Sequence, residues 1–176
     1  MQHLPQLGAS AVLSHRGLGK VQPQVCGREF RNQVLDFIAC NPPRFGVNWA
    51  SSMDVAIRLA NWLLAYSFLK AAGISFDSAF DEVFATSVVD HGRHIASNLE
   101  WHRGRRNNHY LANVVGLLFA SAFCDAGAES KRWGEFGEKA LLEEIEYQFH
   151  GEGTNFEGSV SYHRLSAEIA AYGIAV

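Results

Sequence analysis

The positions of proline and of apolar residues divide the chain into a broken first part and a long helical part. All four prolines lie within the first 43 of the 176 residues. Because proline interrupts a helix from within, the part after them can be helical throughout. Its apolar residues recur at intervals of three and four, the spacing of one helix face. The pattern indicates helices and no convincing strand.

Cap and turn residues predict where the central helices begin and end. Ser51 and Asp54 have the spacing of a capping box, which predicts a long helix that stops at Gly73. Asp77 can cap the next helix, whose apolar positions continue at mixed three- and four-residue spacing. We expect that helix to end near His102.

The second half of the chain predicts two contrasting helices. Asn107 or Asn108 caps the first, and its run over 110–123 is apolar on nearly every face, so it should be buried on both sides. Residues 131–149 form a more amphipathic helix with a glutamate-rich, solvated side. Neighbouring helices must therefore surround the apolar one.

Both ends of the chain also read as helical. Two weaker helices are expected at 4–13 and 28–39, and a glycine-rich loop at 150–158 precedes a last helix that starts near Ser159. Residues 165–176 stop inside this helix without a capping signal, so we expect the chain to be a piece of a longer protein.

Alternation of buried and half-exposed helices predicts an all-α fold of antiparallel helical hairpins. An α/α toroid or solenoid needs this alternation, because its inner helices are covered on both sides and its outer helices are half solvated. The sequence has no repeat of fixed period, which disfavours a regular repeat array.

Composition narrows the class of protein. With 48% hydrophobic residues the chain can bury one core, so one globular unit is expected. A net charge of −3 provides no basic footprint for nucleic acid. The N-terminus does not read as a signal peptide, and no apolar run is long enough for a membrane span. The odd, widely spaced cysteines argue against a metal knuckle or disulfide framework. They are Cys26, Cys40 and Cys124.

Two polar clusters, at 107–110 and 155–164, stand out from the apolar background. Together they contain amides, imidazoles, a phenol and a guanidinium, which suit proton abstraction next to a carboxylate. His109 falls in the first turn of its helix, where the helix dipole favours a neutral imidazole that can accept a proton. In the alternative interpretation, Asn107 and Asn108 only cap the helix and His109 only packs.

Tyr162 needs a cationic neighbour before its phenol can act as a base. His163 and Arg164 follow it, but adjacent helical residues point about 100° apart, so only one of the two can flank the phenol. Glu157 can cap the last helix or orient a neighbouring side chain. The same side chains could also be ordinary interface residues.

Several motifs of the chain resemble the heparinase II/III and alginate lyase group of polysaccharide lyases. They are Asn48-Trp49 with 53–58 and Asn61-Trp62, then 107–113, then 155–159 with 161–164. The resemblance covers nearly the whole chain. It implies an incomplete α/α toroid, of which residues 1–176 would be one unit, followed by antiparallel β-sandwich domains that this chain does not contain.

The resemblance also implies a reaction, β-elimination at a uronic acid. Asn108 matches the amide that neutralises the carboxylate, His109 the imidazole beside it, and Tyr162 the catalytic phenol. Arg164 matches a substrate-contacting arginine. Relatives use a further histidine from the β-rich region.

Further substrate-binding candidates are Asn107, His163, Trp49 and Glu157. The implied partner is an anionic polysaccharide or oligosaccharide, the implied compartment is the bacterial periplasm or cell exterior, and no cofactor is implied. The sequence gives no indication of oligomeric state.

Two residues before the clusters have open roles. Trp49 can stack on a sugar ring or anchor the packing. Arg58 lies inside an apolar helix, where it either finds a buried partner or reaches the cleft. The remaining histidines lack ligand spacing, so no metal is expected. They are His3, His15, His91, His94, His102 and His150.

Two other function classes remain open. A helical scaffold could bind peptides in an apolar groove. An α/α-toroid glycoside hydrolase would need two facing carboxylates, for which Glu157 with Asp54 or Asp90 are the candidates.

Overall fold

The structure, a computed structural model, describes residues 2–102, 106–124 and 127–176. The described residues form helices and one short 3-10 turn, with no strand beyond an isolated bridge between Phe149 and Asn155. The elements are α1 (Leu4–His15), α2 (Pro23–Cys40), η1 (Val47–Trp49), α3 (Ser52–Ala71), α4 (Ser78–Ser97), α5 (Asn108–Phe123), α6 (Ala128–Gln148) and α7 (Val160–Ala175). The predicted all-α class is confirmed.

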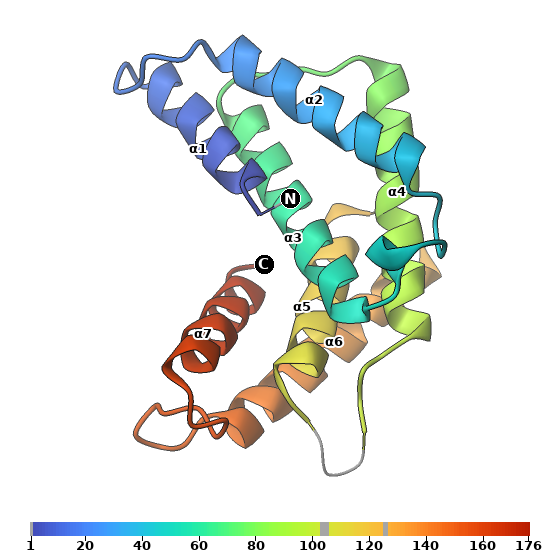
Figure 1. Ribbon diagram of the computed structural model, residues 1–176, viewed down its shortest axis with the longest axis vertical. Coiled ribbons are helices and arrows are strands. Elements are labelled where there is room, and N and C mark those ends of the chain that lie inside the picture. The colour runs from blue at the N-terminus through green and yellow to red at the C-terminus, as the bar shows by residue number, and fades with distance from the viewer. Residues whose placement is uncertain (1, 103–105, 125–126) are drawn as a thin grey trace.

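The helices lie in two layers. Helices α1, α3, α5 and α7 pack side by side in chain order, while α2, α4 and α6 each pair with the preceding odd-numbered helix (Figure 1). Helix α5 contacts α3, α4, α6 and α7. This arrangement matches the expected alternation of inner and outer helices. Closure into a toroid stays a prediction.

Side-chain caps fix the starts of four described helices, α3, α4, α5 and α7. The Ser51 hydroxyl accepts a hydrogen bond from the Asp54 amide at 3.3 Å, and Asp77 accepts from the Phe80 amide at 2.9 Å. Gly73 follows α3 with a φ of +80°, a conformation that favours glycine. These predicted boundaries are confirmed, and the cap of α7 is Ser159, as the sequence indicates.

Other boundaries differ from the predictions. Helix α2 begins at Pro23 rather than residue 28, because proline without an amide hydrogen fits the first turn of a helix. Helix α4 ends at Ser97 rather than near His102. The side chain of Asn98, the next residue, donates to the His94 carbonyl at 2.8 Å. Helix α6 also starts earlier than expected, at Ala128.

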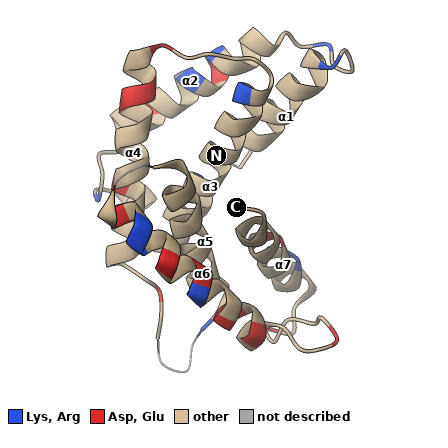
Figure 2. Cartoon of the chain, turned by 180° about the vertical axis from the view of Figure 1, so that it is seen from behind, with Lys and Arg blue, Asp and Glu red and all other residues tan. Residues whose placement is uncertain are grey.

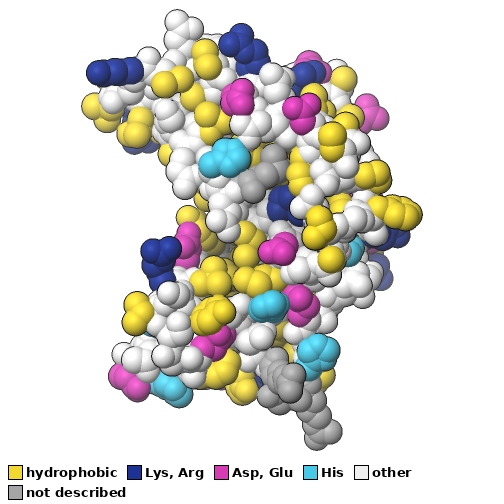
Figure 3. Space-filling model, in the orientation of Figure 1, with side chains coloured by type: hydrophobic (Ala, Val, Ile, Leu, Met, Phe, Trp, Pro, Cys, Tyr) yellow, Lys and Arg dark blue, Asp and Glu magenta, His cyan; other side chains and the backbone are white. Residues whose placement is uncertain are grey.

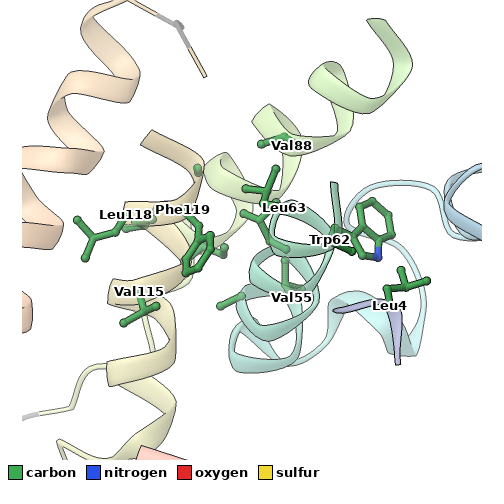
Figure 4. Packing of buried hydrophobic residues seen from close by; sticks show 14 of the residues in the cluster. Leu4, Val55, Trp62, Leu63, Val88, Val115, Leu118 and Phe119 are labelled. Carbon is green, nitrogen blue, oxygen red and sulfur yellow. The ribbon is translucent and has the colours of Figure 1, made fainter. Parts of the chain in front are cut away.

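Apolar contacts between α3 and its neighbours make up the centre of the core. Trp62 and Val55 of α3 are fully buried, and Figure 4 shows α3 side chains packed between Leu4, Val88 and Val115 from α1, α4 and α5. Helix α6, by contrast, carries charged residues along its outer side (Figure 2). Within the described ranges, no helix is long and apolar enough to cross a membrane.

Helices α3 and α5 approach each other closely at Gly116. A Cβ atom there would lie 2.7 Å from the Ala56 Cβ and 3.0 Å from its Cα. We expect Gly116→Ala to lower the free energy of unfolding by about 1–3 kcal/mol relative to Gly134→Ala, because the backbone of α3 must move. Gly134 is the matched control, since it is also helical and its Cβ would meet only the Ser121 side chain. Urea denaturation measures both, and equal stabilities would contradict the prediction.

Candidate active site

The first polar cluster lies at the start of α5. The Asn107 side chain caps this helix by accepting from the His109 amide at 3.2 Å. Asn108 follows as the first helical residue and is 3% exposed. The cap prediction therefore holds for Asn107, while Asn108 turns its amide inward.

A glutamate from the second cluster binds Asn108. The Glu157 carboxylate accepts from the Asn108 Nδ2 at 2.8 and 3.0 Å and from its backbone amide at 3.2 Å. The two clusters are thus joined directly. The donors at this helix end, where the dipole favours negative charge, bind a carboxylate in this structure.

The loop that carries Glu157 is held by its own hydrogen bonds. The Phe156 amide donates to the Gln148 carbonyl at 3.0 Å, and the Glu157 amide donates to the Asn155 side chain at 3.0 Å. Asn155 is 5% exposed, so the turn before Glu157 is anchored in the protein. Hydrogen bonds within its loop therefore hold Glu157 next to Asn108.

A buried ionic network supports the other side of the α5 start. Glu144 of α6 is fully buried and accepts from Arg106 and, at 2.8 Å, from Gln148. Gln148 also donates to the Asn107 carbonyl at 3.0 Å. Burial, reinforced by the Glu144 charge, raises the pKa of Tyr110, which keeps that phenol neutral.

His109 points to a different carboxylate. Its Nδ1 lies 3.2 Å from the Glu100 Oε1, and its side chain is 45% exposed. Sequence reasoning missed Glu100, which follows α4 outside any periodic helix face and belongs to neither polar cluster. No local pattern marks it, because its contacts come from α3 and α5.

The phenol of Tyr162 is open to solvent at the start of α7. Its residue is 49% exposed, and its backbone amide donates to the Ser159 cap at 3.5 Å. His163 packs against the Phe149 ring, and Arg164 is exposed. Among the described residues, neither His163 nor Arg164 hydrogen-bonds to the Tyr162 hydroxyl.

An open groove of about 400 Å³ lies between the middle parts of α3, α5 and α7. It is lined mainly by apolar residues of α3, α5 and α7, with Arg164 and Glu168 among its polar ones. Figure 3 shows the hollow between α7 and the N-terminal helices. Of the candidate residues, Arg164 lines it directly.

Trp49 and Arg58 belong to a buried cluster. Trp49 is 4% exposed and donates from Nε1 to the Asn41 carbonyl, which favours the packing interpretation over sugar stacking. Arg58 is 7% exposed, donates to the His91 Nε2 at 3.0 Å and lies over the Phe37 ring. Its partners are thus a neutral imidazole, aromatic faces and the Asn48 carbonyl, to which it donates at 2.9 Å.

The fold and site together define a helical domain that carries an amide, an imidazole and a phenol at the starts of two neighbouring inner helices. In the described part of the chain, no cluster of side chains could hold a metal ion. The sequence model of the Heparinase II/III N-terminus family matches residues 23–175, so the chain belongs to this family. The predicted resemblance to heparinase II/III-like polysaccharide lyases is confirmed.

One characterised relative is the heparin-sulfate lyase of Pedobacter heparinus. It is 31% identical over 99 residues, which cover 55% of this chain and 15% of the relative. The chain thus matches only a small part of that enzyme's length. No solved structure matches the chain.

The contact between Glu157 and Asn108 leads to a prediction about the stability of the fold. Glu157→Ala leaves two buried donors of Asn108 unpaired, so we expect the free energy of unfolding to fall by about 1–3 kcal/mol. Glu152→Ala is the matched control, because Glu152 is exposed in the same loop and accepts a hydrogen bond from Thr154. Equal melting temperatures of the two variants would show that the Glu157 contact contributes nothing to stability.

His91 makes a prediction about pH. Burial, followed by the Arg58 charge, lowers the pKa of His91 from 6.5 to about 3. Between these values the unfolded chain binds a proton that the folded chain does not, so the free energy of unfolding decreases as pH falls below about 6.5. His91→Gln should make that decrease shallower in urea titrations at pH 7 to 5, whereas His150→Gln, at an exposed position, should not. An unchanged slope in the first variant would contradict the assignment.

Proposed function

We propose that the protein is a polysaccharide lyase that cleaves uronic-acid-containing polysaccharides by β-elimination. The observation that carries the proposal is the Glu157 carboxylate on Asn108, which joins the two polar clusters. It also supports the idea that the start of α5 attracts carboxylates. The substrate's own carboxylate would compete with Glu157 for the Asn108 amide.

Three side chains carry out the proposed reaction. Asn108 neutralises the uronate carboxylate, which stabilises the enolate-like dianion that forms when the C5 proton leaves. Tyr162 or His109 takes that proton. The electron pair forms the C4–C5 double bond as the C4–O bond breaks, and Tyr162 gives a proton to the leaving oxygen. The products are an unsaturated uronate end and a free hydroxyl end.

Exposure supports these roles. The Tyr162 residue is 49% exposed and the His109 side chain 45% exposed, so both are accessible to a polymer from solution. Arg164, exposed and lining the groove, is the candidate for a second contact with the anionic substrate. Asn107 is committed to its cap and His163 packs on Phe149, so we assign them a supporting role.

The hydrolase alternative gains no support from the carboxylates. Glu157 is bound to Asn108, and Asp54 and Asp90 lie on α3 and α4. A pair flanking one glycosidic bond would have to be about 5–10 Å apart with the acid free to donate. On the family resemblance, we extend the proposal to a periplasmic or secreted location in a bacterium.

Turnover of uronate polymers tests the proposal. In the full-length protein we expect Tyr162→Phe and Asn108→Ala each to lower kcat/KM by about 10²–10⁴-fold, because each removes a proton-transfer or charge-stabilising group. Absorbance of the unsaturated product measures the rate on a panel of heparan-type and alginate-type polymers. Tyr147→Phe is the control, because Tyr147 is an exposed tyrosine of α6 that does not line the groove. Full turnover by Tyr162→Phe and Asn108→Ala would refute the mechanism.

A further inference from the structure

The Glu100 carboxylate contacts three residues of α3 and α5, namely Met53, Asn113 and His109. Its Oε2 accepts from the Met53 amide in the first turn of α3 at 2.7 Å and lies 3.4 Å from the Asn113 Nδ2. Its own amide donates to the Asn113 Oδ1 at 2.7 Å, and Asn113 is fully buried. Glu100 is therefore held rigidly before it meets His109.

The remaining oxygen determines which nitrogen of His109 carries a proton. Oε1 faces the His109 Nδ1 at 3.2 Å, and an ionised carboxylate can only accept hydrogen bonds. The neutral imidazole must therefore hold its proton on Nδ1, which leaves Nε2 as the acceptor. Since the side chain is 45% exposed, Nε2 can be reached from solution.

We propose that Glu100 is a positioning residue, which fixes the Nδ1–H tautomer of His109 so that Nε2 accepts a proton from the bound uronate. The tautomer assignment stands on the contacts of Glu100 alone. The role toward the uronate rests on the proposed lyase function.

The network gives the substitution Glu100→Gln a specific consequence. A glutamine has one acceptor oxygen, and two donors, the Met53 amide and the Asn113 Nδ2, converge on the inner position. The oxygen should stay there, and the new NH₂ group should face His109. It would then donate to Nδ1, so the proton of the neutral imidazole moves to Nε2.

Histidine ¹⁵N NMR of the full-length protein, with His109 assigned by loss of its signals in His109→Gln, tests the tautomer directly. We expect an unprotonated Nε2 in the wild type and an unprotonated Nδ1 in Glu100→Gln. In the product-absorbance assay, kcat should fall about 10²-fold or more while KM changes little, because a proton acceptor is lost and not a binding contact. Glu135→Gln, which alters an exposed α6 carboxylate paired with Lys131, should change neither measurement.

The outcomes separate this proposal from the proposed function. A wild-type His109 with its proton on Nε2 overturns the proposal, even if Glu100→Gln fails to fold. An unchanged tautomer or unchanged kcat in a folded Glu100→Gln also overturns it, provided that Tyr162→Phe is inactive. If Tyr162→Phe and Asn108→Ala are fully active, the lyase mechanism fails, and the role toward the uronate fails with it.

Discussion

The bond between Glu157 and Asn108 is the contact on which the site depends. It fixes the loop before α7 to the start of α5, and Tyr162 lies in the first turn of the helix that follows this loop. It also satisfies two donors at a helix end that otherwise has no internal partners for them. One carboxylate therefore binds the donors at the start of a helix, holds a loop and joins the two polar clusters.

The Glu100 carboxylate likewise binds groups at two helix starts, those of α3 and α5. It caps the start of α3 through the Met53 amide and at the same time orients His109 at the start of α5. Buried polar groups are costly unless bonded, so each carboxylate is placed where several donors converge. The stability of the inner layer and the geometry of the reactive side chains are consequently coupled, because the same atoms serve both.

Local rules predicted the helices whose ends are set by their own residues. Ser51, Asp77 and Ser159 cap as the sequence indicates, since a cap bonds an amide two or three residues away. The error at α2 arose from treating Pro23 as a break, although proline is well tolerated in a first helical turn. The overlong α4 came from apolar spacing that continued past the Asn98 cap.

The sequence by itself determined the all-α class, the buried character of α5 and the family, because periodicity and motifs are properties of consecutive residues. The tertiary structure decided that Trp49 is buried, that Glu157 binds Asn108 and that Glu100 faces His109. Hydrogen bonds between residues far apart in the chain depend on how helices pack, and no local spacing encodes them.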